Sequence, residues 1–224
     1  MYILYGGDYT RAPLVQWVLE EGGIPFEFRK IDIMTGEHKT PEFLAINPAG
    51  LIPVLVTPEG DALFEMAALM VYLAERHALT DLAPPVGDPQ RGLFLSTVFF
   101  IADLQPEIKR FHFPHRFALR TEDVLTVRDR AKAIVLDRLG IVNARLAKSG
   151  PYLLGSRFSL ADFHLCFWIA LVDRRSAQEK FPAVAGLYDL VRARPSVTRH
   201  LAEAEAMADE YNEMVRTNPT GVIA

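Results

Sequence analysis

Cysteine is almost absent from this sequence, whose 224 residues include only Cys166. A single cysteine cannot form a disulfide bond within the chain. Cys166 lies in the apolar run of residues 165–168, which has helical character, and free cysteines usually behave as small hydrophobic residues. We therefore expect Cys166 to be a buried structural thiol.

A long hydrophobic run and a block of basic residues are also missing. No apolar stretch approaches the ~20 residues that span a bilayer, and the N-terminus lacks the basic flank and apolar segment of a signal peptide. Lysine and arginine total 24 against 28 acidic residues, which indicates no nucleic-acid surface. We expect a soluble, cytoplasmic protein with neither a membrane nor a nucleic-acid partner.

Hydrophobic residues, in contrast, make up 50% of the chain, which is enough for two compact cores. Residues 78–89 contain Pro84, Pro85, Gly87 and Pro89, which sustain neither a helix nor a central strand. We place a linker there, between domains at residues 1–77 and 90–224.

The first domain alternates between strand and helix periodicities. Short β-rich runs at residues 2–5, 26–33, 54–57 and 62–64 predict strands, and helical spacing follows at residues 14–22, 41–46 and 66–73. The predicted order is βαβαββα, with a parallel opening pair of strands.

The second domain has helical spacing throughout, which predicts an all-α fold. Its sharpest signal is a helix start, where Ser159 can cap the helix, Asp162 can reach back to it, and Phe158 can pack on Phe163. A further helix is expected between residue 182 and the pair Arg194-Pro195.

Several motifs occur in an order that closely resembles bacterial glutathione transferases. They are GEHKTPEFLAINP (residues 36–48), GLIP (50–53), YLLGSRFSLAD (152–162) and RARPSV (192–197). Each motif alone is weak, but chance rarely places several in the right order. The resemblance covers nearly the whole chain. It implies a thioredoxin-like N-terminal domain that binds glutathione and an all-helical domain that lines the acceptor-substrate pocket.

The resemblance implies glutathione contacts around Pro53 and at the third helix. A cis peptide bond before Pro53 would let the backbone of Ile52 pair with the cysteinyl group, whereas a trans proline would merely begin a strand. Glu65 takes the place of the acid that meets the γ-glutamyl ammonium group. Met66 replaces the family's serine. It could belong to the core and still bind a carboxylate through its backbone N–H.

A second departure from the family is Leu51, where relatives often carry lysine or glutamine toward the glycyl carboxylate. His38 and Lys39 remain as cationic candidates for that carboxylate. Either side chain could instead be an ordinary solvated residue before the next helix.

The resemblance also implies a hydrogen-bond donor to the glutathione thiolate, placed after the first strand. A free thiol with a pKa near ~8.5 is mostly protonated at neutral pH, so donors and a helix dipole must lower that pKa. Counting back from Leu19 aligns Thr10 with the family's catalytic serine or cysteine. Tyr9 is the second candidate and Tyr5 the third, while Thr10 could serve only as a helix cap.

The acceptor pocket is expected between the two domains. Residues 108–117 mix three aromatic with five basic or imidazole side chains, and we select Phe111, His112 and His115 as candidates to line a pocket for an aromatic or anionic electrophile. The alternative is a helix end with packed aromatics and solvated cations. The two histidines lack further metal ligands, so we expect no metal. Asp103 could reach a partner subunit's glutathione or serve only at the surface.

Together these residues predict a homodimeric glutathione S-transferase of the detoxification type, which activates the glutathione thiol for attack on a small electrophile. Glutathione-dependent isomerisation, dehalogenation and ether cleavage would use the same thiolate and stay open. So does a non-catalytic binding protein on the same fold, which Met66, Leu51 and the threonine at position 10 favour.

Overall fold

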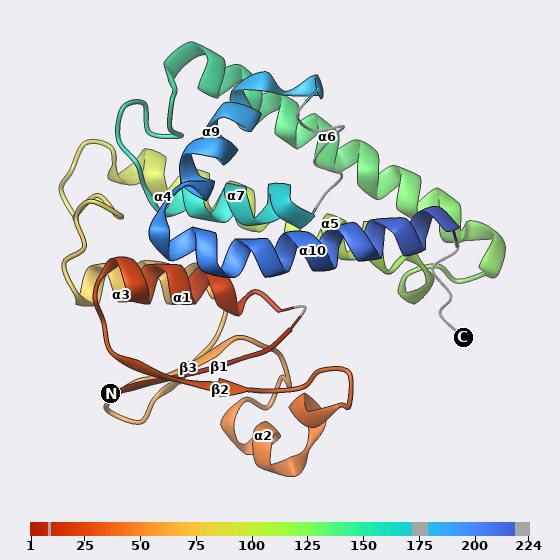
Figure 1. Cartoon of the computed structure of the whole chain (residues 1–224), viewed down its shortest axis with the longest axis horizontal. Coiled ribbons are helices and arrows are strands. Elements are labelled where there is room, and N and C mark those ends of the chain that lie inside the picture. Colours follow the sequence, from red (N-terminus) through yellow and green to blue (C-terminus); the bar gives the residue numbers. More distant parts are fainter. Residues whose placement is uncertain (9, 172–178, 218–224) are drawn as a thin grey trace.

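A four-stranded mixed sheet forms the lower part of the molecule in Figure 1. The computed structural model describes residues 1–8, 10–171 and 179–217. The strands are β1 (Tyr2–Gly6), β2 (Phe26–Lys30), β3 (Val54–Val56) and β4 (Ala62–Leu63). Across the sheet their order is β2-β1-β3-β4, with β1 parallel to β2 and the other neighbours antiparallel. The predicted parallel opening pair is confirmed.

Three helices complete this domain and confirm the βαβαββα order. They are α1 (Ala12–Glu21), α2 (Pro41–Ile46) and α3 (Met66–Arg76), with a 3₁₀ turn η1 at Glu37–Lys39. Figure 1 shows α1 and α3 on one face of the sheet, toward the other helices, and α2 on the opposite face. The strand alternation explains this division, because Leu4 belongs to the large core on the α1 side and Tyr5 packs with Phe43 of α2.

The second strand is shorter than the expected run of residues 26–33. Ile31 still donates its N–H to the carbonyl of Gly6, but β1 ends there and offers no further partner. Asp32 then accepts hydrogen bonds from the N–H groups of Met34 (2.8 Å) and Thr35 (3.3 Å). These bonds form a local turn that ends the strand.

The described residues after position 90 form helices and their connections, as predicted. Its helices are α4 (Arg91–Ala102), α5 (Gln105–His112), α6 (Val124–Ser149), α7 (Leu160–Leu171), α9 (Pro182–Arg192) and α10 (Pro195–Thr217), with 3₁₀ turns η2 (Pro114–Arg116) and η3 (Thr121–Asp123). In the fully described segment between α3 and α4 there is neither helix nor strand, where we placed the linker.

Helix α7 is the centre of the helical domain, since every residue from 160 to 170 is buried. Its predicted start is confirmed. Asp162 accepts the N–H of Ser159 at 2.7 Å, Ser159 Oγ accepts the N–H of Ala161 at 3.3 Å, and the rings of Phe158 and Phe163 lie 4.9 Å apart. Cys166 is buried as expected, and burial raises the pKa of its thiol.

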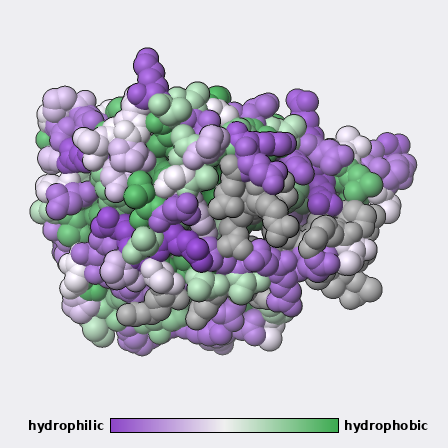
Figure 2. All heavy atoms as spheres, turned by 45° about the horizontal axis from the view of Figure 1, so that its top comes forward, coloured by the Kyte–Doolittle hydropathy of each residue, from purple (hydrophilic) through white to green (hydrophobic). Residues whose placement is uncertain are grey.

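The two domains share one hydrophobic core, because α1 packs between the sheet and α7. Trp17 of α1 lies 5.6 Å from the ring of Phe163 and 6.2 Å from that of Phe167. On the face shown in Figure 2, hydrophobic residues are scattered among hydrophilic ones. Among the described residues, no helix has the length and hydrophobicity needed to cross a membrane.

Candidate functional site

The strand register brings three separate segments to one edge of the sheet. Tyr5 of β1 is paired with Val54, and Leu55 is paired with Leu63. Continuing these antiparallel registers places Pro53 beside Gly6 and opposite Glu65. The loop that carries Thr10 follows β1 directly, so it lies at this same edge.

Ile52 presents an open stretch of backbone at this edge. In the described part of the chain, neither its N–H nor its C=O has a hydrogen-bond partner. The loop before it is held by side chains, because the Asn47 amide donates to the Leu51 carbonyl (2.8 Å) and Lys39 Nζ donates to the Gly50 carbonyl (2.9 Å). The peptide bond between Ile52 and Pro53 is cis, which confirms that prediction.

The start of α3 offers further open groups. Glu65 precedes the helix with φ 70° and ψ 99°, an uncommon conformation for a residue with a Cβ, and its side chain makes no capping hydrogen bond. The first intrahelical bond runs from the N–H of Leu69 to the Glu65 carbonyl, so the N–H groups of residues 66–68 point out of the helix without such a partner. Met66 is 3% exposed, which confirms its place in the core.

The hydroxyl group of Thr10 is already engaged in its own loop. It donates to the Gly7 carbonyl at 2.6 Å and accepts the N–H groups of Gly7 (3.2 Å) and Ala12 (3.3 Å). The Tyr5 hydroxyl accepts a hydrogen bond from Arg29 at 3.0 Å on the α2 side of the sheet. Thr10 is therefore better placed than Tyr5 as the candidate donor to the glutathione thiolate, because the Tyr5 hydroxyl lies on the α2 side of the sheet. Tyr9, the other candidate, lies outside the described residues.

Arg11 is a charged group at this edge that sequence reasoning missed. Its Nη1 atom is buried and has no hydrogen-bond partner in the described structure. Burial lowers the pKa of Arg11, and the charge of Glu65 partly opposes that shift. A signal was available, because a cation at the first turn of a helix opposes the helix dipole. Such local conflicts occur at functional sites.

The two cationic candidates for the glycyl carboxylate have different surroundings. Lys39 donates to the carbonyls of Gly50 and, at 3.4 Å, Ala49, so part of its hydrogen-bonding capacity is used by the loop. The Nδ1 atom of His38 is buried without a partner among the described residues. Both side chains lie in η1, next to the segment that leads to Ile52.

The expected acceptor residues do not all face open space. Phe111 is buried, with the guanidinium of Arg128 at 5.1 Å from its ring centroid. His112 Nε2 is 2.9 Å from the Leu171 carbonyl, and burial lowers the pKa of His112 to about 4, so the ring is neutral at pH 7. His115 keeps a buried Nδ1 atom without a partner in the described structure. A pocket-lining role for these residues stays a prediction.

Asp103 makes an ion pair with Arg138 at 2.6 Å and is well exposed, so its predicted reach to a partner subunit also stays a prediction. Among the described residues, no cluster of three or more histidine, cysteine or acidic side chains is arranged to hold a metal.

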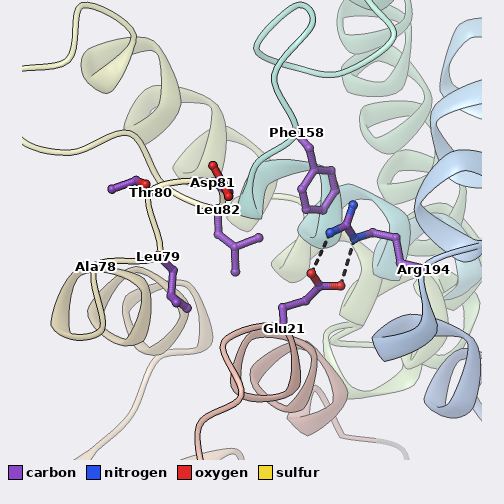
Figure 3. A pocket seen from close by; sticks show the side chains of 8 residues that line it. All are labelled: Glu21, Ala78, Leu79, Thr80, Asp81, Leu82, Phe158 and Arg194. Carbon is purple, nitrogen blue, oxygen red and sulfur yellow. Dashed lines mark hydrogen bonds and ion pairs between the residues drawn. The ribbon is translucent and has the colours of Figure 1, made fainter.

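A distinct pocket of about 380 Å³ lies at the opposite end of α1. It is lined by Glu21, residues 78–82, Phe158 and Arg194 (Figure 3). Arg194 donates two hydrogen bonds to Glu21, at 3.1 and 2.7 Å, and its guanidinium lies 4.1 Å from the Phe158 ring centroid. The charges of Arg194 and Glu21 neutralise each other. We therefore interpret this pocket as part of the contact between the two domains and not as a ligand site.

Comparison with known proteins identifies one family. Models of the glutathione S-transferase N-terminal and C-terminal domains match residues 14–76 and 123–204. Glutathione S-transferase 3 of Zea mays is 31% identical over 84% of this chain and 87% of its own length. The disulfide-bond oxidoreductase YfcG of Escherichia coli is 30% identical over 95% of this chain and 100% of its own length.

Solved structures show the same fold. A glutathione transferase of Burkholderia graminis, crystallised with two glutathione molecules bound per subunit, is 28% identical with a TM-score of 0.75, covering 89% of this chain and 87% of that one. A homologue from Sulfitobacter with bound glutathione is 25% identical with a TM-score of 0.77, covering 92% and 99%. Sequence and structure therefore lead to the same conclusion, that this chain belongs to the glutathione S-transferase family.

Proposed function

We propose that this chain is a glutathione transferase that binds glutathione at the edge formed by Ile52 and Glu65 and activates its thiol beside Thr10. The open backbone of Ile52 carries this proposal, because an extended peptide can pair with its N–H and C=O as an added strand. The bound glutathione of the Burkholderia and Sulfitobacter structures supports it.

The charges at this edge suit the two ends of glutathione. The Glu65 carboxylate would receive the γ-glutamyl ammonium group, and the open N–H groups at the start of α3 would receive the adjacent carboxylate. His38 and Lys39 would receive the glycyl carboxylate at the other end. The backbone N–H groups of α3 thus replace the serine hydroxyl that Met66 lacks.

The Thr10 hydroxyl would donate to the glutathione sulfur. Its proton now points to the Gly7 carbonyl, and losing that bond costs about 1 kcal/mol. A hydrogen bond to a thiolate is charge-assisted and offsets this loss. The thiolate would then attack the electrophilic carbon of the acceptor substrate and displace its leaving group or add to it.

Calorimetric titration with glutathione tests this site in the wild-type chain and in Glu65→Gln. We expect saturable binding that Glu65→Gln weakens about tenfold, because the neutral amide no longer attracts the ammonium group. Glu59→Gln is the matched control, since Glu59 is paired with Arg76 at the surface. If no heat of binding is seen at millimolar glutathione, a glutathione-independent function on this fold becomes the better interpretation.

A second candidate is glutathione-dependent disulfide reduction, which the likeness to the Escherichia coli disulfide-bond oxidoreductase favours. The chain's single cysteine is 0% exposed within α7, so the glutathione thiol would perform the exchange. Parallel assays with chlorodinitrobenzene and with hydroxyethyl disulfide distinguish the two reactions. We also propose a homodimer, which sedimentation over a range of protein concentrations tests.

A further inference from the structure

Arg11, which follows Thr10 in the chain, and Lys109 are two cations that come from different domains. Arg11 directly precedes α1, and Lys109 is in α5. Burial and, to a smaller extent, the positive charge of Arg11 lower the pKa of Lys109, so the two cations are within electrostatic reach of each other. In the described structure neither side chain forms an ion pair, and the Arg11 Nη1 atom has no hydrogen-bond partner.

A hydrogen bond near the end of α5 shows which helix lies beside Lys109. His112 follows it by three residues on the same helical face, and His112 Nε2 is bound to the carbonyl of Leu171 at the end of α7. Two turns earlier on α7 is His164, whose pKa is lowered by burial and by the charge of Arg11. The end of α5 therefore lies against the end of α7, which itself packs on α1, and Lys109 is an exposed side chain one turn before that contact.

Among the described residues, the charges that act on Lys109 are mostly positive. Glu65 raises the pKa of Lys109, whereas Arg116 of η2 lowers it, so within the described part of the chain Arg11, Lys109 and Arg116 act against the one acid Glu65. In the proposed complex Glu65 is neutralised by the ammonium group of glutathione. A buried guanidinium N–H without a partner is destabilising, and an anion bound beside it would supply the missing hydrogen bond.

Extending the proposed function, we infer that the acceptor substrate carries an anionic group, such as a carboxylate, and that Arg11 and Lys109 bind it between α1 and α5. The guanidinium of Arg11 can donate two parallel hydrogen bonds to a carboxylate, and the Lys109 ammonium adds a mobile charge. The acceptor site then selects substrates by charge as well as by shape.

Two glutathione conjugates that differ by one carboxylate test this inference. They are S-benzylglutathione and S-(4-carboxybenzyl)glutathione, and calorimetry measures the dissociation constant of each. We expect the wild-type chain to bind the carboxylate about tenfold more tightly. Lys109→Met should lower this preference to about twofold, with little change for S-benzylglutathione.

Lys132→Met is the matched control, because Lys132 is an exposed lysine of α6 outside this cluster, and it should keep the full preference. Arg11→Lys, which retains the charge, should keep part of the preference that Arg11→Met loses. Equal binding of the two conjugates by the wild-type chain, or a preference unchanged in Lys109→Met, would overturn the inference while leaving glutathione binding intact. Failure of both conjugates to bind would instead reject the proposed function.

Discussion

At Thr10, one hydroxyl group takes part in three hydrogen bonds that shape the loop after β1. The same group is the candidate donor to the thiolate, so its loop role and its proposed chemical role compete for one proton. Serine could satisfy both roles, because it keeps the hydroxyl group and lacks the methyl group that restricts the rotamer of threonine.

Replacing Thr10 by alanine should lower kcat/KM for conjugation about tenfold or more, which corresponds to roughly 1.4 kcal/mol of transition-state stabilisation. Thr10→Ser should stay within about threefold of the wild type. Binding of S-methylglutathione, which has no thiol proton, separates chemistry from loop collapse. Its dissociation constant should be the same in all three proteins, and a parallel loss of this binding would assign Thr10 to loop structure.

At the scale of elements, α5 and α7 carry two buried histidines that remain neutral. Burial lowers the pKa of His112 to about 4 and that of His164 to about 3. His164 is completely buried, and although the Val98 backbone is near its ring, neither ring nitrogen has a partner in hydrogen-bond geometry. These helices should therefore respond to acid before the rest of the domain.

The direction of the change in stability with pH follows from the unfolded chain, in which histidine has a pKa of about 6.5. Below that pH the unfolded chain binds more protons than the folded one, so stability is complete above pH ~6.5 and falls as the pH drops toward ~4. We expect His164→Leu to reduce this slope by up to about 1.4 kcal/mol per pH unit. Urea unfolding at a series of pH values measures it, and parallel curves for the two proteins would contradict the assignment.

At the scale of the whole molecule, Arg194 joins the two domains at the pocket of Figure 3. It binds Glu21 at the end of α1, which also accepts a hydrogen bond from Ser196 Oγ at 2.6 Å, and it stacks on Phe158. This explains why the RARPSV motif is part of the helical domain and yet acts on the thioredoxin-like domain.

Arg194→Met should lower the free energy of unfolding by about 2 kcal/mol, because it removes a partly buried pair and a cation–π contact. Arg76→Met is the control. It breaks an exposed, solvent-screened pair with Glu59 and should lower the free energy of unfolding much less than Arg194→Met does. Chemical denaturation measures the free energy of unfolding of both variants. Equal losses would show that Arg194 contributes no more to stability than an exposed ion pair does.

Local sequence signals were sufficient to predict much of the fold of this protein. The order of the elements, the start of α7 at Ser159 and Asp162, and the core position of Met66 followed from periodicity, capping and motif. These features depend on residues a few positions apart, which a sequence displays directly. The strand ends were less predictable, because β2 stops where its partner β1 stops.

The candidate site depended on contacts between distant segments. The strand register placed Pro53, next to the open backbone of Ile52, opposite Glu65. The packing of two domains buried the Nη1 atom of Arg11 and brought its charge within electrostatic reach of Lys109, almost a hundred positions away. Burial and unmet hydrogen bonds are properties of the folded surroundings, and a residue's own sequence neighbours do not specify them. The residue types thus determined which chemistry was available, and the tertiary structure decided which groups were left open to perform it.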